Sequence, residues 1–218
     1  MNAVVSGATL RTVAAPEGYR AELERDVVTY DGLVYRLRPI VPEDAERLVA
    51  FHRRLSSHSV YLRFFTFHPE LSAKEVERFT HIDYRDRLAL VATRDGELMA
   101  VGRYDRTAGT EEAEVAFVVA DDFQHHGIGS LLLDALADAA RAVGITAFKA
   151  DTLAENRAML DVFRHAGFPL HTSIEYGTVS VRFPITIDEG YAEARRLRDA
   201  TRYVTAVPPT DDNPGLLL

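Results

Sequence analysis

Gln124-His125-His126-Gly127-Ile128-Gly129 is the stretch of sequence that decides the fold. It lies between an alternating apolar segment, residues 113–120, and an amphipathic segment, residues 128–143, so the pattern predicts a strand, a loop and a helix. Two glycines in the loop allow a row of backbone N–H groups to point at one place, where the helix adds the positive end of its dipole. A loop of this kind binds phosphate or pyrophosphate without a basic side chain.

Two familiar phosphate-binding loops do not fit this spacing. The P-loop requires a lysine directly after its second glycine, and the chain contains no Gly-Lys pair. The dinucleotide fingerprint requires a third glycine three residues after the second, and that position is Leu132. The pattern that remains is Q-x-x-G-x-G between a strand and a helix. Taken alone, it fits equally well a loop in which the glycines only allow the chain to turn.

The composition limits the classes of protein that the chain can belong to. Its 218 residues fit one domain with short extensions, and 47% apolar residues are enough for a core. The absence of cysteine excludes disulfides, thiolate zinc sites and a thiol nucleophile. No apolar run approaches the roughly 20 residues of a membrane span, and no signal peptide is evident at the start. We therefore expect a cytoplasmic protein without a membrane partner.

The charge distribution bears on the partners. The net charge is −8, and no basic cluster exceeds a short pair such as Arg53-Arg54, which argues against nucleic acid. A cationic partner such as an amine fits this charge, and so does ordinary solubility. The eight histidines form no H-E-x-x-H motif or close triad, so we predict no metal site.

Hydrophobic periodicity and turn residues predict the other elements. Strands are predicted at residues 33–38, 88–93, 98–104, 111–120, 146–150, 171–176 and 179–183. Helices are predicted from Pro42, from the capping residue Ser72, and at residues 128–143, 154–165 and 188–202. The aromatic block at residues 57–67 fits either the core or a substrate wall. This order predicts an α/β (α+β) fold with a mixed sheet.

Two motifs and the element order resemble the GNAT superfamily of acyl-CoA-dependent N-acetyltransferases, over residues 35–183. The hexapeptide is similar to the pyrophosphate loop of that family, and Asn156 followed by Gly167-Phe168 is similar to its second signature. The resemblance implies a mostly antiparallel sheet of about seven strands with helices on both faces. It divides the chain into an N-terminal arm (1–32), an acetyltransferase domain (33–185) and a C-terminal helix with a disordered tail (186–218).

A narrower resemblance points to bacterial protein lysine acetyltransferases. The segments at residues 35–40, 43–44, 61–65 and 79–84 look like the acetyltransferase domain of those proteins. Because only some 30 residues precede the domain, we expect the stand-alone catalytic form without a cyclic-nucleotide module. The resemblance implies acetyl-CoA as cosubstrate. Its contacts would be Phe117, Val118, Val119, Gln124, His125, His126, Gly127, Ile128, Gly129, Ser130, Asn156 and Phe163.

The chemistry requires a base near the loop. An amine attacks a thioester only as the free base, and a lysine has a pKa of about 10.4. A carboxylate near the end of the preceding strand is the natural base. Glu114 is our prediction, since it also matches the Glu of the A-E-V/I-A-F segment of the lysine acetyltransferases. Glu112 shares its face by alternation and is the second candidate; a solvated edge carboxylate is the alternative for Glu114.

The other site residues carry less defined roles. A backbone N–H in residues 117–119 would polarise the thioester carbonyl. Many family members carry a tyrosine acid where this chain has Phe163, so we expect water to protonate the leaving thiolate. His125 and His126 fit plain loop positions as well as charged contacts to pyrophosphate. The leading hypothesis is transfer of acetyl to a protein lysine. The alternatives are a small amine acceptor (polyamine, amino acid or aminoglycoside) and a non-catalytic acyl-CoA sensor.

Overall fold

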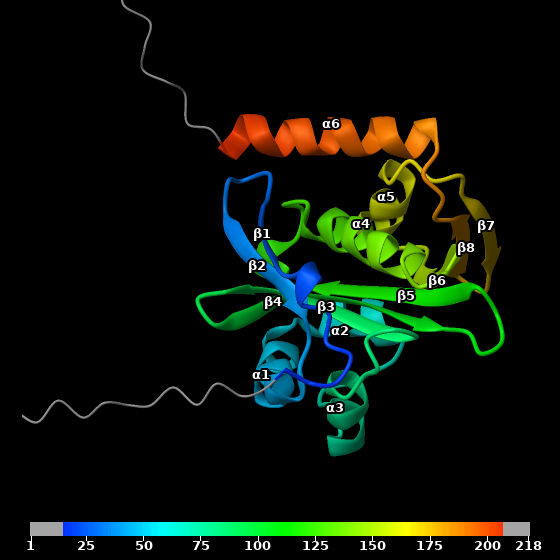
Figure 1. The fold of residues 1–218 in the computed structure, drawn as a ribbon. Helices are drawn as coiled ribbons and strands as arrows, with labels where there is room; N and C mark the ends of the chain where they lie inside the picture. Colours follow the sequence, from blue (N-terminus) through cyan, green and yellow to red (C-terminus); the bar gives the residue numbers. More distant parts are fainter. Residues whose placement is uncertain (1–14, 207–218) are drawn as a thin grey trace, which may run out of the picture.

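The computed structural model describes residues 15–206, in which a single eight-stranded sheet separates two layers of helices (Figure 1). The strand order is β1-β2-β3-β4-β5-β6-β8-β7, and all neighbours are antiparallel except β5 and β6. This is the mixed, mostly antiparallel sheet that we predicted, with eight strands in place of about seven. The strands are β1 Arg25–Val28, β2 Val34–Pro39, β3 Arg87–Arg94, β4 Glu97–Arg106, β5 Glu112–Val119, β6 Ala147–Leu153, β7 His171–Glu175 and β8 Thr178–Pro184.

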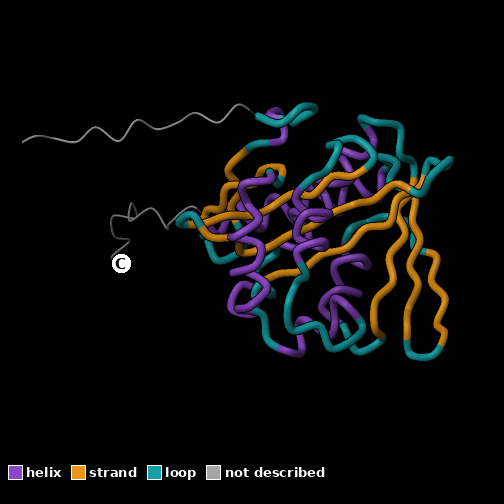
Figure 2. Tube along the Cα trace, turned by 90° about the horizontal axis from the view of Figure 1, so that it is seen from below, coloured by secondary structure: helices purple, strands orange, loops and turns teal. Residues whose placement is uncertain are grey.

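Helices cover both faces of the sheet. They are α1 Ala45–Arg54, α2 Ser57–Phe64, α3 Ala73–Thr80, α4 Ile128–Arg141, α5 Arg157–His165 and α6 Glu189–Ala206. The first three lie on one face, α4 and α5 lie on the other, and α6 runs across the outside of α4 and α5 (Figure 1). Each face has its own hydrophobic cluster. Seen from the side of α1–α3, the strands at the right of the view, β6 to β8, have no helix in front of them (Figure 2).

Local sequence explains the turns and helix starts that were predicted. Ser72 and Glu75 form a capping box at the start of α3. The β3–β4 hairpin turns at Asp95-Gly96, with φ of 53° and 82°, and the β7–β8 hairpin turns at Tyr176-Gly177, with φ of 46° and 81°. Two successive positive φ angles suit the right-handed twist of the flanking strands, which is why a two-residue turn serves both hairpins.

Three predictions need correction, and one segment that had no predicted secondary structure is helical. The predicted N-terminal arm contains β1, which pairs antiparallel with β2. The aromatic block contains helix α2, with Ser56 as its N-cap. Pro42 opens a 3₁₀ turn, Pro42–Asp44, before α1 begins. The helix predicted from residue 154 begins at 157, because Asn156 caps it. The remaining parts of the predicted arm and tail, residues 1–14 and 207–218, lie outside the described residues.

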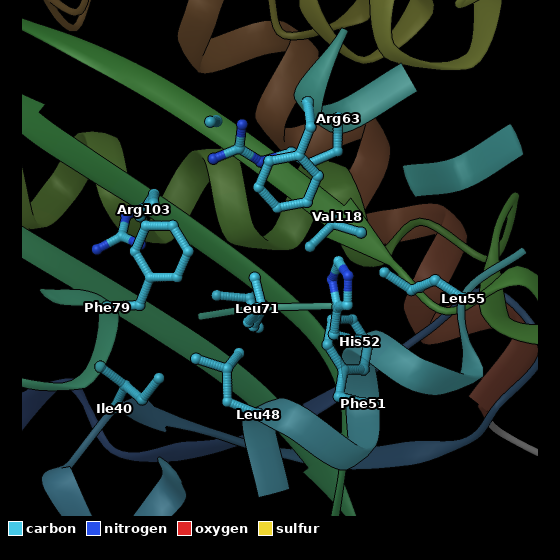
Figure 3. A pocket seen from close by; sticks show the side chains of 13 residues that line it. Ile40, Leu48, Phe51, His52, Leu55, Arg63, Leu71, Phe79, Arg103 and Val118 are labelled. Atoms are coloured by element: carbon cyan, nitrogen blue, oxygen red, sulfur yellow. The ribbon is translucent and has the colours of Figure 1, made fainter. Parts of the chain in front are cut away.

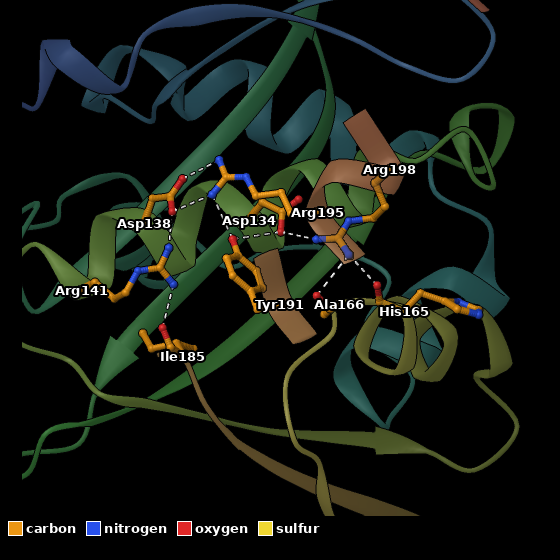
Figure 4. Close-up of polar contacts among 9 residues, drawn as sticks. All are labelled: Asp134, Asp138, Arg141, His165, Ala166, Ile185, Tyr191, Arg195 and Arg198. Carbon is orange, nitrogen blue, oxygen red and sulfur yellow. Dashed lines mark hydrogen bonds and ion pairs between the residues drawn. The ribbon is translucent and has the colours of Figure 1, made fainter. Parts of the chain in front are cut away.

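Helix α6 is fastened to α4 by buried charges (Figure 4). Arg198 donates to Asp134 at 2.7 Å and to the carbonyl oxygen of Ala166 at 3.1 Å. Arg195 donates to both carboxylate oxygens of Asp138 at 2.9 Å. The Arg198–Asp134 pair is more than nine-tenths buried, so α6 is an integral part of this layer.

Candidate functional site

Strands β5 and β6 separate soon after they meet. They pair in parallel from Glu112↔Ala147 to Glu114↔Lys149, whereas β5 stays paired with β4 as far as Val119. The N–H of Ala120 donates to a carbonyl in β4, so strand alternation turns the backbone groups of Phe117 and Val119 away from β4. Those of Val118 face β4. Because β6 has separated from β5 here, the backbone groups of Phe117 and Val119 face a side of β5 where no strand is paired with it.

The loop after β5 ends at a helix start that has no side-chain cap. Gly127 is the N-cap of α4, and no side chain accepts from the first turn of the helix. The N–H groups of Ile128, Gly129 and Ser130 have no partner within a helix at these positions. Together with the helix dipole, N–H groups in this arrangement can bind an anion. The side chain of Ile128 is buried in the core, so only its backbone can serve a ligand.

The two glycines of the loop are required for different reasons. Gly127 has φ of 87°, and a Cβ atom at this position would lie 2.6 Å from the ring of Tyr30. A Cβ atom at position 129 would lie 3.2 Å from Cγ2 of Val162 in α5. His125 also has a positive φ, 66°. The glycines therefore permit the turn and allow β1–β2, α4 and α5 to approach closely.

The turn between β1 and β2 supports this loop. The N–H of Tyr30 donates to the carbonyl oxygen of His126 at 3.0 Å, and Nδ1 of His126 lies 2.7 Å from a carboxylate oxygen of Asp31. Burial favours the neutral form of Asp31, but hydrogen bonds from Thr29 and Leu33 and the nearby His126 outweigh it and lower the pKa of this carboxyl. The imidazole of His126 thus faces Asp31, and the side chain of His125 is exposed.

Gln124 holds the loop to the protein. Its Nε2 donates to Oγ of Ser59 at 3.0 Å and to the carbonyl oxygen of Val119 at 3.1 Å. Asp121 in turn accepts from Ser59 and from both N–H and O–H of Ser56. These bonds join the start of α2 to the end of β5. The amide nitrogen of Gln124 therefore positions the loop, and its contact with the cofactor remains a prediction.

Asn156 and Phe163 mark the helix beside the gap. Oδ1 of Asn156 accepts from the N–H of Met159 and caps α5. Phe163 is 1% exposed, and its ring centroid lies 6.3 Å from that of Phe117 and 5.6 Å from that of Phe183. Since its ring belongs to the core, a direct contact of Phe163 with the cofactor remains a prediction that burial does not favour.

Glu114 is exposed, on the face of β5 opposite α4. It makes no hydrogen bond or ion pair within residues 15–206, and it borders an open groove of about 410 Å³ with Lys149, Asp151 and His171. Glu112 differs, because it accepts from Nε of Arg182 at 3.0 Å, and this bond lowers the pKa of its carboxyl. The geometry leaves Glu114 available as a base and commits Glu112 to an ion pair.

Sequence reasoning missed several residues around the site. Tyr30 and Asp31 lie in a segment without periodicity, where only Asp31-Gly32 signals a turn. In the aromatic block, Phe64 lines a second, smaller cavity, and Phe67 is 80% exposed.

No helix within the described residues is long and apolar enough to cross a membrane. In the same part of the chain, no group of three or more histidine, aspartate or glutamate side chains could hold a metal ion.

Comparisons with known proteins agree with this geometry. Residues 57–168 match the model of the acetyltransferase (GNAT) family. The GNAT domain of S. lividans PAT is 47% identical, with a TM-score of 0.72 over 76% of this chain and 99% of that domain. Acetyltransferase Pat of Mycolicibacterium smegmatis is 36% identical over 61% of this chain, which spans 40% of Pat. Acetyltransferase PA5475 of Pseudomonas aeruginosa is 36% identical over 63% of this chain and 76% of its own length.

Proposed function

Because the chain belongs to the GNAT acetyltransferase family, we propose that it transfers the acetyl group of acetyl-CoA to a lysine amine of a protein, in the cytoplasm. The observation that carries the proposal is the pairing of two features at one place. The exposed backbone edge of β5 lies directly before the uncapped start of α4. A long donor with a pyrophosphate at one end and amides along its arm is complementary to both.

The donor would be held mainly by backbone. Its pyrophosphate would accept from the N–H groups at the start of α4, where the dipole favours negative charge. Its pantetheine amides would bond to the edge of β5 at Phe117 and at the N–H of Val119, since the carbonyl oxygen of Val119 already accepts from Gln124. Asn156 keeps its side-chain NH₂ group for a contact on the other side of the gap, because its oxygen caps α5. His125, Gly127, Gly129 and Ser130 would contribute through the loop and the first helical turn.

Glu114 would act as the base. It takes a proton from the acceptor ammonium, directly or through a water, and the free amine then attacks the thioester carbon. A C–N bond forms, the C–S bond breaks, and the thiolate leaves. Water would protonate the thiolate, since the position of a phenolic acid in other family members holds the buried Phe163. A backbone N–H of β5 would stabilise the oxyanion.

Two observations support a protein acceptor. The 47% identity with the GNAT domain of S. lividans PAT extends over three quarters of this chain. In addition, the groove beside Glu114 is open, and β7 along it is exposed throughout. A broad open surface suits a lysine that is attached to a folded protein. A small amine acceptor is the alternative, and an acyl-CoA sensor without catalysis is a further one.

The test is acetyl transfer from acetyl-CoA to a panel of proteins and small amines, with mass spectrometry of the products. We expect acetylated lysine on at least one protein, and loss of the product with Glu114→Gln but not with Glu112→Gln. Acetylation of polyamines, amino acids or aminoglycosides only would support the alternative. Binding of acetyl-CoA without transfer to any member of the panel would support a sensor.

A further inference from the structure

A small cavity lies on the other side of β5 from α4, between the sheet and α1–α3 (Figure 3). Its volume is about 40 Å³, and most of its lining is apolar, including Phe51, Phe79 and Val118. Two guanidinium groups also line it, those of Arg63 from α2 and Arg103 from β4. Figure 3 shows both side chains on the same side of the cavity.

Arg103 is buried without hydrogen bonds. Its residue is 8% exposed, and its Nε has no hydrogen-bond partner among the described residues. The guanidinium lies over the ring of Phe79 at 4.4 Å, and its nearest carboxylate, that of Asp105, lies at 3.4 Å. Asp105 is already bonded to Nε of Arg87 at 2.8 Å. Burial lowers the pKa of Arg103 to about 10.

Arg63 also lacks a hydrogen-bond partner among the described residues, although its side chain is partly exposed where that of Arg103 is buried. Within residues 15–206 it makes no hydrogen bond or ion pair, and its guanidinium lies 5.2 Å from the ring centroid of Phe64. Burial lowers its pKa, and only the more distant charges of Glu114 and Asp105 oppose this. The charges around Arg103 include Arg63, Arg78 and Arg87 against Asp105. The surroundings of the cavity are therefore positive, although the chain as a whole carries a net charge of −8.

The hydrogen bonds of these two guanidinium groups are incomplete, because Arg63 makes none among the described residues and Arg103 has only the ion pair with Asp105. Buried polar groups are nearly always hydrogen-bonded, and leaving a charged one without a partner is costly. A guanidinium binds a carboxylate through two parallel hydrogen bonds. Apolar walls favour a carboxylate carried on hydrocarbon, and the volume restricts it to a few heavy atoms. The expected ligand is a short aliphatic carboxylate.

The cavity also adjoins the proposed reaction centre. Ala116 and Val118 in its wall follow Glu114 on the same face of β5, by strand alternation. A group bound there would therefore belong to one of the two reactants. This step rests on the proposed function, which places the thioester along β5.

We propose that Arg63 and Arg103 bind the carboxylate of a short, carboxylate-bearing reactant. Its source is the acyl chain of a dicarboxylic acyl-CoA such as malonyl-CoA, as a further donor beside acetyl-CoA, or the carboxylate of a free amino acid, as a further acceptor beside a protein lysine. The reaction itself is unchanged. The amine forms the C–N bond, the C–S bond breaks, the amine proton goes to Glu114, water protonates the thiolate, and the bound carboxylate takes no part in the chemistry.

The first experiment compares donors and acceptors that differ in one carboxylate. Malonyl-CoA is compared with butyryl-CoA at a fixed acceptor, and lysine is compared with lysine amide at fixed acetyl-CoA. In one of these two comparisons, we expect kcat/KM to be at least tenfold higher for the compound that carries the carboxylate. We expect Arg63→Met and Arg103→Met to abolish this preference, and Arg103→Lys to restore part of it. The exposed Arg53→Met serves as control.

A second measurement does not depend on turnover. Free malonate should raise the melting temperature of the full chain and of Arg53→Met, and leave that of Arg103→Met unchanged. Methionine keeps most of the buried stem and removes a buried charge, and Asp105 keeps its bond to Arg87, so we expect this variant to fold. Equal kcat/KM in both arms, with no effect of malonate, would overturn the proposal. Absence of acetyl transfer to every acceptor, with the malonate effect intact, would overturn the proposed function instead.

Discussion

A carboxylate oxygen of Asp31 lies 2.7 Å from Nδ1 of His126, and this contact joins the β1–β2 turn to the loop before α4. The same turn places the ring of Tyr30 against Gly127. Both residues of the turn precede the part of the chain that matches the family model. The first turn of the sheet is therefore a component of the proposed donor site, although it lies far from that site in sequence.

Asp31→Asn should loosen the loop. We expect the Kd for acetyl-CoA to rise several-fold, with kcat at saturating donor nearly unchanged, because Asp31 supports the loop and does not meet the reacting atoms. Asp26→Asn, which alters another carboxylate of this hairpin that pairs with Arg36, is the control. Calorimetry gives Kd, and equal values for the two variants would contradict the role of Asp31.

The pH dependence of stability provides an independent readout for Asp31. Its pKa is lowered in the folded chain, so the carboxylate stabilises the fold at pH values above its ordinary pKa of about 3.9. This stabilisation is lost as the pH falls through the lowered native pKa. Unfolding of Asp31→Asn should therefore depend less on pH below about 4 than unfolding of the wild type.

The histidine pair should make donor binding pH-dependent. Imidazolium forms a stronger hydrogen bond to phosphate than neutral imidazole does, so bound phosphate favours the protonated form. Acetyl-CoA should therefore bind more tightly at pH 6 than at pH 8. Phosphates of the donor titrate in the same range, so the comparison is with the His125→Gln/His126→Gln double variant. Parallel curves of Kd against pH would reduce both residues to plain loop positions.

Gly129→Glu should weaken acetyl-CoA binding at least tenfold, or about 1.4 kcal/mol. The new carboxylate would stand in the first turn of α4, where the pyrophosphate is expected, and its Cβ would meet Val162. Gly129→Gln has the same bulk without the charge, so it separates repulsion from crowding. By calorimetry, we expect Gly129→Gln to lose clearly less affinity for acetyl-CoA than Gly129→Glu. Unchanged affinity in a folded Gly129→Glu variant would reject the phosphate site.

Glu114→Gln should lower turnover by roughly 10²- to 10⁴-fold at neutral pH, with donor affinity nearly intact. Glu112→Gln should mainly break the surface ion pair with Arg182 and leave kcat close to that of the wild type. Steady-state kinetics on both variants decide the assignment. The reverse pattern would move the base two residues along the same face of β5.

Arg198→Ala should destabilise the fold by about 3–5 kcal/mol, because it leaves Asp134 as a buried charge without its guanidinium. The double variant Asp134→Leu/Arg198→Met should recover much of this loss. Arg196→Ala, in the exposed pair with Glu193, should change the free energy of unfolding by less than about 0.5 kcal/mol. Urea titration measures all three, and similar values for the two single variants would contradict the integral role of α6.

Local signals in the sequence predicted most of the sheet and the strand, loop and helix around Gly127. The two-residue turn at Asp95-Gly96 and the capping box at Ser72 depend on neighbours in sequence, so they could be read directly. Strand β1 could not be predicted in this way, because a strand of four residues, Arg25–Val28, with two charged side chains shows no clear alternation.

Contacts between distant residues account for the rest of the site. Gln124 bonds to Ser59, which is 65 residues away, and Tyr30 meets Gly127 across a still longer separation. Arg63 and Arg103 lie on different elements and share one cavity. Tertiary contacts of this kind leave no periodic pattern in the sequence. The point at which β5 and β6 stop pairing, Glu114 with Lys149, leaves no such pattern either.

The separation of β5 and β6 has a mechanical consequence. Up to Glu114, hydrogen bonds hold the two strands at a fixed distance. Beyond Glu114, β5 and β6 are no longer paired. From there the spacing depends on a row of rings that runs from Phe117 in β5 through Phe163 in α5 to Phe183 in β8. Phe163 is the middle spacer of this row. The width of the opening therefore depends on the volume of these side chains, and a smaller residue at position 163 would narrow it.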